Sequence, residues 1–217
     1  MVDFSLNEPC AVPRRRDPAT TRRKLLVAAR REFARNGLAG ARVDEIATQA
    51  GVNKQLVYHY FGDKDALYFA VLDWVYDEIV QYERGFNIDG LSPDQAIRKL
   101  VQSSFDYLEL HPDCVAILND ENRHDAAHVR NLAHFAKIRT PLLRIFSRTL
   151  AQGVREGLFR KGVSPEQLYI SITALSYFYF SGMPTLSAIL NKDLGTKAAL
   201  RTRRKHVVDF VMQSLRP

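Results

Sequence analysis

The chain has 217 residues, of which 46% are hydrophobic, and its formal net charge is +7. This length suits a small domain joined to a larger one, with enough apolar residues for a core. The basic balance favours an anionic partner, either nucleic acid or an anionic membrane surface. No apolar run approaches the roughly 18 residues of a membrane span, and the N-terminus lacks the order of a signal peptide, so we expect a cytoplasmic protein without membrane contact.

The two cysteines, Cys10 and Cys114, are far apart and have no framework spacing. This usage is typical of a reduced, intracellular protein, and no zinc pattern is present. We therefore expect no metal and no other cofactor.

Residues 1–17 are predicted to be a flexible basic arm that ends in "PRRRD". The arginines Arg14, Arg15 and Arg16 either follow a DNA minor groove or backbone or form a solvated tail. Asp17 and Pro18 then resemble the start of a helix.

The first predicted helix has an apolar face that includes Leu25 and Phe33 at helical spacing, and it ends at Asn36-Gly37. Its basic residues Arg30, Arg31 and Arg35 are expected on an exposed face.

A short helix around Ile46 follows, and Gly51 suits its left-handed C-cap. Asn53 is the expected cap of a second short helix, from Lys54 to about Phe61, and Asp63 is the expected cap of a long one. Two helices of about eight residues joined by a glycine turn indicate a helix-turn-helix, and we place this domain at residues 18–66.

The remaining residues, 67–217, also show helical patterns, with Ser-Pro helix starts at Ser92 and Ser164 and a last helix over roughly Thr196 to Leu215. Asp113 is another candidate cap. Because no segment shows the period of two that is typical of strands, the sequence predicts an all-α protein.

The segment from Thr21 to Leu72 resembles the N-terminal DNA-binding domain of the TetR family of bacterial transcription regulators. The matching elements are the "LLVAA…F…NG" first helix, "VDEIATQAGV" and "LVYHYFGDKDAL", in the family's order and spacing. The resemblance implies an all-α homodimer that is a repressor with a ligand-binding C-terminal domain (67–217), released from its operator by a small molecule. It also implies that the last two helices form the dimer interface. The C-terminal part is similar to a branch that includes regulators of aromatic and N-heterocycle degradation, so we expect an aromatic effector.

In a helix-turn-helix, the N-terminal residues of the second helix read bases, and neighbouring side chains contact phosphates. Helix position and the resemblance predict these DNA contacts: Arg42, Lys54, Gln55, Tyr58, His59, Tyr60 and Lys64. Lys64 is expected on a phosphate beside a helix N-terminus. Arg42 departs from the small hydroxyl residue that the family often has there.

Helix position in the C-terminal part also suggests a set of residues that line an apolar small-molecule pocket. The set is Phe105, Tyr107, Leu108, Cys114, Leu118, Asn122, Phe135, Phe146 and Tyr177. For Tyr177, which lies in the cluster "YFYFSGM", the core and the dimer interface remain alternatives.

Glu121, His124 and His128 have the spacing of metal ligands on one helix face. Their surroundings are polar, so a pocket rim and a solvated helix junction remain open as alternatives. Two further functions stay open for the whole chain. An enzyme would need a complete metal set or a nucleophile-base pair, and neither is evident. A ligand-independent architectural DNA binder would have no cavity in its C-terminal part.

Overall fold

The structure is a computed structural model that describes residues 17–131 and 135–217, with backbone alone for residues 131 and 135–141. Within these ranges the chain is helical and forms no strand, as predicted. The helices in chain order are α1 (Pro18–Gly40), α2 (Val43–Ala50), α3 (Lys54–Phe61), α4 (Lys64–Arg84), α5 (Pro93–Leu110), α6 (Pro112–Arg123), the 3-10 helix η1 (Val129–Asn131), α7 (Phe135–Arg155), α8 (Pro165–Ser181), α9 (Met183–Leu190) and α10 (Lys197–Leu215). No helix in the described part is long and apolar enough to cross a membrane. The predicted arm lies outside the described residues, except for Asp17.

Local capping chemistry defines the N-terminal helices where the sequence predicted them. Asp17, Asn53 and Asp63 precede α1, α3 and α4, and each side chain accepts a hydrogen bond from a backbone N–H of the helix that it caps. Gly51 ends α2 with a φ of 67°, a left-handed conformation that glycine adopts without steric cost. The turn between α2 and α3 is therefore encoded locally.

The first helix is broken at Gly37, where φ is 66° and ψ is 177°, at the end that the sequence predicted, and a further turn carries α1 to Gly40. One predicted cap differs in the structure. The N-cap position of α6 is His111, because Pro112 opens this helix. Asp113 therefore lies in the first turn, where its carboxylate forms an ion pair with Arg30 instead of a cap.

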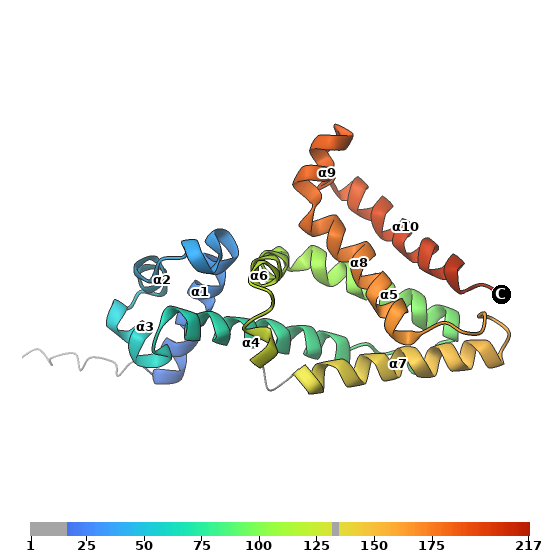
Figure 1. The fold of residues 1–217 in the computed structure, drawn as a ribbon, viewed down its shortest axis with the longest axis horizontal. Coiled ribbons are helices and arrows are strands. Elements are labelled where there is room, and N and C mark those ends of the chain that lie inside the picture. Colours follow the sequence, from blue (N-terminus) through green and yellow to red (C-terminus); the bar gives the residue numbers. More distant parts are fainter. Residues whose placement is uncertain (1–16, 132–134) are drawn as a thin grey trace, which may run out of the picture.

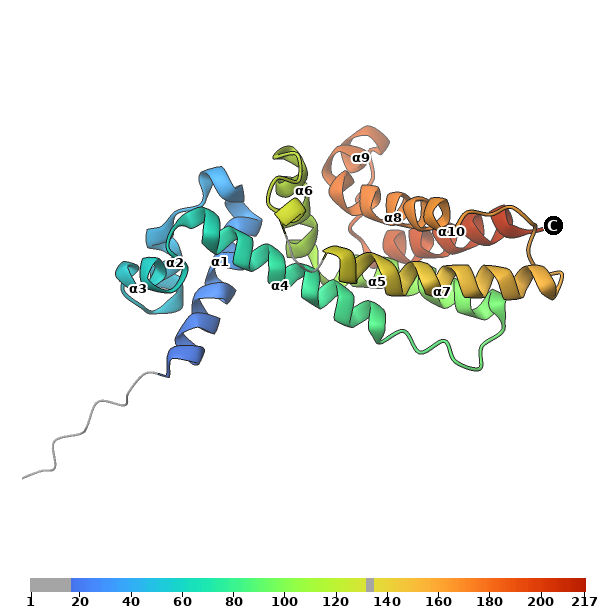
Figure 2. The same ribbon diagram turned by 60° about the horizontal axis from the view of Figure 1, so that its bottom comes forward.

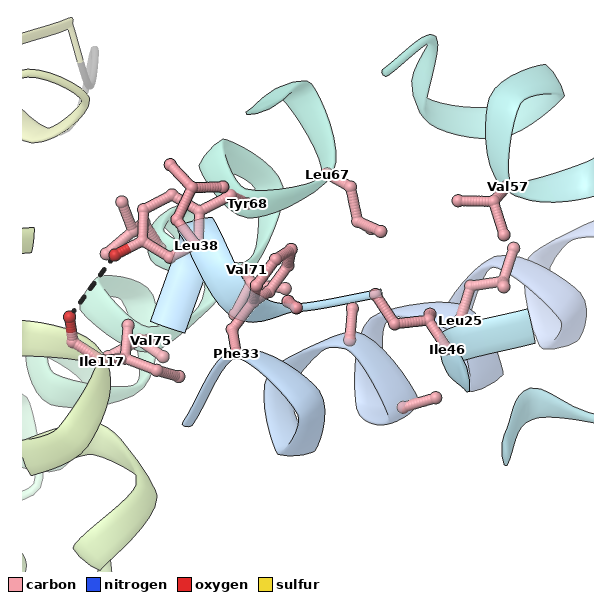
Figure 3. Close-up of a cluster of buried hydrophobic side chains, with 14 of the residues drawn as sticks. Leu25, Phe33, Leu38, Ile46, Val57, Leu67, Tyr68, Val71, Val75 and Ile117 are labelled. Carbon is pink, nitrogen blue, oxygen red and sulfur yellow. Dashed lines mark hydrogen bonds between the residues drawn. The ribbon is translucent and has the colours of Figure 1, made fainter. Parts of the chain in front are cut away.

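A first hydrophobic core joins the N-terminal helices to α4. It includes Phe33 of α1, Ile46 of α2 and Val57 of α3, all almost fully buried. Figure 3 shows the cluster extending from Val57 and Ile46 at one end, through Phe33 and Val71, to Val75 of α4 at the other. The core thus extends beyond residue 66, where the sequence placed the domain boundary.

The same core reaches α6 through Ile117. The Tyr68 hydroxyl of α4 donates a 3.5 Å hydrogen bond to the Ile117 carbonyl, drawn as the dashed line in Figure 3. The first half of α4 and part of α6 therefore pack with the helix-turn-helix.

A second core lies among α5, α7, α8 and α10, with Leu100, Phe146, Ile172 and Val211 among its buried members. In Figure 1, α1 to α3 form one end of an elongated molecule, α4 runs from them toward the second bundle, and α6 lies between the two ends. Figure 2 shows the same arrangement after rotation, with α5, α7, α8 and α10 grouped beyond α6. The two helices that connect the ends are therefore α4 and α6.

Candidate DNA-binding surface and small-molecule cavity

The exposed face of α3 carries the predicted base-reading residues. Val57 is fully buried and anchors the helix, so the opposite face points to solvent. Lys54, Gln55 and His59 are exposed, and the Tyr58 side chain is 44% exposed although it is large and aromatic. Tyrosine at such a place offers a hydroxyl for phosphate and a ring face for sugars and thymine methyls.

Tyr60 differs from its neighbours on α3. It is partly buried and packs against the first core, and its ring lies 5.3 Å from the His59 ring in an edge-to-face contact. One side of Tyr60 therefore supports α3 while the rest of the ring remains accessible.

The Lys54 side chain is held by the neighbouring helix. Its ammonium lies 2.9 Å from the Asp44 carboxylate of α2, and this hydrogen bond raises the pKa of Lys54. Both side chains are largely exposed, so the pair is weak and can exchange for a phosphate.

Lys64 has structural contacts at the start of α4. Its ammonium donates to the carbonyl oxygens of Ala39 and Ala41, at 3.3 and 3.4 Å. These carbonyls lie at the end of α1, so Lys64 ties α4 to α1 as well as lying near the proposed phosphate surface. Arg42, at the N-cap position of α2, is exposed.

A buried carboxylate that the sequence did not identify fixes α2 against α1. Glu32 is 5% exposed and accepts hydrogen bonds from the Arg42 backbone N–H at 3.1 Å and from the Asn36 side chain at 2.9 Å. The sequence pattern did not indicate that Glu32 is buried, because exposed charged residues surround it on the same helix.

A cavity of about 330 Å³ lies in the C-terminal part, between α4, α5, α6 and α8. The predicted residues Tyr107, Leu108, Leu118, Asn122 and Tyr177 line it. The Tyr177 hydroxyl donates a 2.7 Å hydrogen bond to Asn119 of α6. This size, the enclosure by four helices and the aromatic walls are typical of small-molecule sites.

The other predicted pocket residues lie elsewhere. Phe105 and Phe146 are buried in the second core and Cys114 in the first, and none of them lines the cavity. Their side chains pack inside the two cores instead. The prediction was wrong because the position of a residue along a helix does not show which face of that helix meets a cavity. The Phe135 side chain lies outside the described residues.

The sequence did not identify most of the wall that α4 and α8 contribute. The unpredicted lining residues are Tyr76, Ile79, Tyr82 and Glu83 of α4, Phe86 in the loop after it, Ser104 of α5, and Tyr169, Thr173 and Ser176 of α8. Positions 76, 79 and 83 recur at helical spacing along α4, and this period was a usable signal.

Two other hollows are less suited to a small apolar ligand. One, of about 640 Å³, lies between α1 and α2 and is lined by polar and basic side chains that include Arg23, Lys24 and Arg31. The other, of about 570 Å³, lies beside the loop after α4 and includes Asp89 and Arg148. The four-helix cavity is therefore the best candidate for an effector site.

Glu121, His124 and His128, whose spacing left a metal site open as an alternative, do not assemble into one. α6 ends at Arg123, and Asp125 and Ala126 both have a φ of 55°, so Glu121 and His128 do not share a helix. The described residues contain no group of three potential metal ligands.

Glu121 instead closes the turn that follows α6. Its buried carboxylate accepts hydrogen bonds from the backbone N–H groups of His128 and Val129, at 2.8 and 3.0 Å. It also contacts the His128 ring at 2.9 Å. The region is a junction between helices, which was one of the alternatives from the sequence. The Glu121 carboxylate at this junction is buried, however, and not solvated.

Arg30 connects three helices and is not on an exposed face as predicted. Its guanidinium is 2.6 Å from Glu78 of α4 and 2.6 Å from Asp113 of α6, and it lies over the Trp74 ring. Arg31, by contrast, is exposed as expected. A sequence pattern could not distinguish the two because the partners of Arg30 are far away in the chain.

A second bond joins α1 and α6. Asp120, which is 6% exposed, accepts a 2.7 Å hydrogen bond from the Leu38 backbone N–H just after the kink in α1. The helix that carries Leu118 and Asn122 into the cavity therefore holds the first helix of the DNA-binding end.

The outer surface of α8, α9 and α10 carries large apolar side chains. Ile170, Phe178, Ile189 and Phe210 are each more than half exposed. Contiguous exposed apolar patches are typical of protein–protein or membrane interaction sites.

Comparison with known proteins matches both parts of the chain to domains of one regulator family. Residues 25–71 match the model of bacterial regulatory proteins of the tetR family, and residues 93–211 match the tetracyclin repressor-like C-terminal domain. The HTH-type transcriptional repressor NicS of Pseudomonas putida is 34% identical over 196 residues, covering 90% of this chain and 92% of that protein. KstR2 of Rhodococcus jostii, also a repressor, is 28% identical over 145 residues, 67% of this chain and 71% of that protein.

Solved structures share the fold. A tetR-family regulatory protein from Rhodococcus RHA1 has a TM-score of 0.71 at 15% identity, covering 90% of this chain and 97% of its own. The ketosteroid regulator KstR2 of Mycobacterium tuberculosis has a TM-score of 0.66 at 23% identity, with coverages of 90% and 95%. The chain belongs to the TetR family of bacterial transcription regulators, which bind operator DNA and are not enzymes.

Proposed function

We propose that the protein is a homodimeric repressor that leaves its operator when a small molecule occupies the cavity between α4, α5, α6 and α8. The observation that carries this proposal is the position of the cavity. Its walls include α4 and α6, and the same two helices hold α1 through Arg30 and Asp120.

The DNA contact is assigned to α3 and the helix starts beside it. Lys54 and Gln55 lie at the N-terminus of the helix that enters the major groove, and Tyr58 and His59 follow one turn later. Tyr60, Arg42 and Lys64 flank this face and are assigned to the sugar-phosphate backbone.

The dimer contact is assigned to α8 and α10, whose exposed apolar side chains include Phe178 and Phe210. A two-fold dimer places its two α3 helices in successive major grooves, about 34–36 Å apart. Size-exclusion chromatography with light scattering tests this assignment, which requires twice the mass of one chain.

Release follows from a change in the separation of the two α3 helices. A ligand that fits one arrangement of α4 and α6 better than another shifts the population toward that arrangement. Since α1 is bonded to both helices, the DNA-binding end moves with them. An architectural DNA binder would have no use for such a cavity.

The test begins with an operator selected by the protein from a random duplex DNA pool. Fluorescence anisotropy of the labelled operator is then followed as small molecules that raise the protein's melting temperature are added. Release of the operator by a cavity ligand supports the proposal. Binding of ligands to the cavity without any change in operator affinity contradicts it.

A further inference from the structure

The cavity carries one acidic group and, among the described residues that line it, no basic one. Glu83 lies on α4 and is partly buried, and its carboxylate forms no hydrogen bond or ion pair within the described part of the chain. Burial raises the pKa of Glu83 to about 7. A carboxylate placed at an aromatic cavity without a partner is costly unless a ligand supplies one.

Five tyrosines from three helices line the same cavity as Glu83. Tyr76 and Tyr82 belong to α4, Tyr107 to α5, and Tyr169 and Tyr177 to α8. Burial raises the pKa of the Tyr169 phenol, and the charge of Glu83 adds to the rise. Ring faces attract cations because their π-systems are negative at the face, and several rings around one ammonium form a cation site.

We infer that the effector is a compact organic cation, an aryl-substituted alkylamine or a quaternised nitrogen heterocycle, held by the Glu83 carboxylate among the tyrosine rings. This inference rests on the proposed function and adds the charge class of the ligand. An anionic ligand would meet a like charge at Glu83 and find no basic side chain among the described lining residues.

Affinity for such a cation depends on the protonation of Glu83. The other titratable groups that line the cavity are phenols, and burial raises the pKa of each of them above its ordinary value. Beside Tyr82, the ion pair of Asp106 and Arg204 is neutral as a whole. The affinity for an amine is therefore expected to rise as pH increases through about 7, where Glu83 loses its proton.

Isothermal titration calorimetry on the full chain, at about pH 8 so that Glu83 is ionised, tests the inference with three probes of one ring system. These are tryptamine, indole-3-acetamide and indole-3-acetate, which differ chiefly in charge. Benzylamine, benzamide and benzoate repeat the comparison on a smaller ring. The inference predicts that an amine binds at least about tenfold more tightly than its amide and its carboxylate, the size of one good cation-π or charge contact.

The variant Glu83→Gln keeps the side-chain volume and removes the charge. It is expected to bring the amine and the amide to nearly equal affinity and to abolish the rise with pH. Glu109→Gln, on the exposed end of α5, is the control and should leave the preference for the amine unchanged. The inference is overturned if a carboxylate or amide binds as tightly as its amine, if the preference survives in Glu83→Gln, or if neither amine binds at about 1 mM, the weak limit of specific affinity.

Operator release, measured separately, distinguishes the two proposals. If a carboxylate or amide binds the cavity and releases the operator, the charge class is wrong and the proposed function stands. If an amine binds as predicted and the operator stays bound, the charge class stands and the proposed function fails.

Discussion

The Asp120 carboxylate of α6 accepts a 2.7 Å hydrogen bond from the backbone N–H of Leu38, and this bond joins the helix beside the cavity to the end of α1. Both atoms are buried, so no water replaces either partner. The Asp120 carboxylate thus supplies a polar contact through which a change at the cavity can reach the DNA-binding end.

Asp120→Ala is expected to weaken the effect of ligand on operator binding. It leaves a buried N–H unsatisfied, which costs about 1–3 kcal/mol of stability. The measurement is the ratio of operator affinities with and without ligand, which should fall toward one. Glu109→Ala, an exposed acidic residue on α5, is the control. An unchanged ratio in Asp120→Ala would show that coupling takes another route.

Gly37→Ala is expected to destabilise the protein. Gly37 has a φ of 66° and a ψ of 177°, a region accessible almost only to glycine, and a Cβ there would lie 2.6 Å from Asp120 Oδ1. We expect a loss of about 1–3 kcal/mol in the free energy of unfolding, measured by urea denaturation.

Gly40→Ala is the matched control, because a Cβ at Gly40 meets nothing closer than 3.5 Å. It should leave stability unchanged or raise it slightly. Equal stability of the two variants would argue against the tight contact between the kink and α6.

Tyr58→Ala is expected to lower operator affinity by about tenfold or more, a loss of the size of a good DNA contact, without changing the melting temperature. The side chain is 44% exposed, so the fold does not depend on it. Anisotropy with the selected operator gives the affinity, and Lys161→Ala, in an exposed turn of the C-terminal part, is the control.

Lys64→Ala should behave differently from Tyr58→Ala. Its ammonium also holds the carbonyls of Ala39 and Ala41 at the end of α1, so the melting temperature should fall together with operator affinity. If Lys64→Ala binds the operator as tightly as the wild type, Lys64 does not contact the DNA.

Glu83→Gln is expected to stabilise the ligand-free protein above neutral pH. Burial raises the folded-state pKa of Glu83 to about 7, so the folded chain holds its proton while the unfolded chain has lost it. Stability is therefore lost as pH rises from the unfolded pKa of about 4.3 to about 7.

The gain in Glu83→Gln should be on the order of 3–4 kcal/mol near pH 8 and vanish below about pH 4. Urea denaturation at the two pH values measures it. A difference that is independent of pH would show that the Glu83 carboxylate is not desolvated.

Local sequence signals predicted the N-terminal half of the fold well. Asp17, Asn53 and Asp63 each cap the helix that follows, because capping depends on atoms only two or three residues apart. The all-α class followed from the same kind of pattern.

Features that depend on distant packing were not predictable in the same way. Arg30 looked like a surface arginine until α4 and α6 supplied Glu78 and Asp113. Phe105 and Phe146 were assigned to a pocket, but helix packing placed them in the second core. The position of Glu83 at a cavity was not predictable either, because four helices from distant parts of the chain form that cavity.

The most direct measurement compares operator release in the wild-type protein and in Thr173→Trp. Thr173 is an exposed residue of α8 that lines the cavity, so an indole ring at this position occupies the proposed ligand site at little cost to the core. Thr173→Ser, which leaves the cavity open, is the control. Labelled operator is followed by anisotropy as a ligand that stabilises the wild-type protein is added. We expect the wild type and Thr173→Ser to release the DNA, whereas Thr173→Trp no longer responds to the ligand. The same release curve for all three proteins would contradict it.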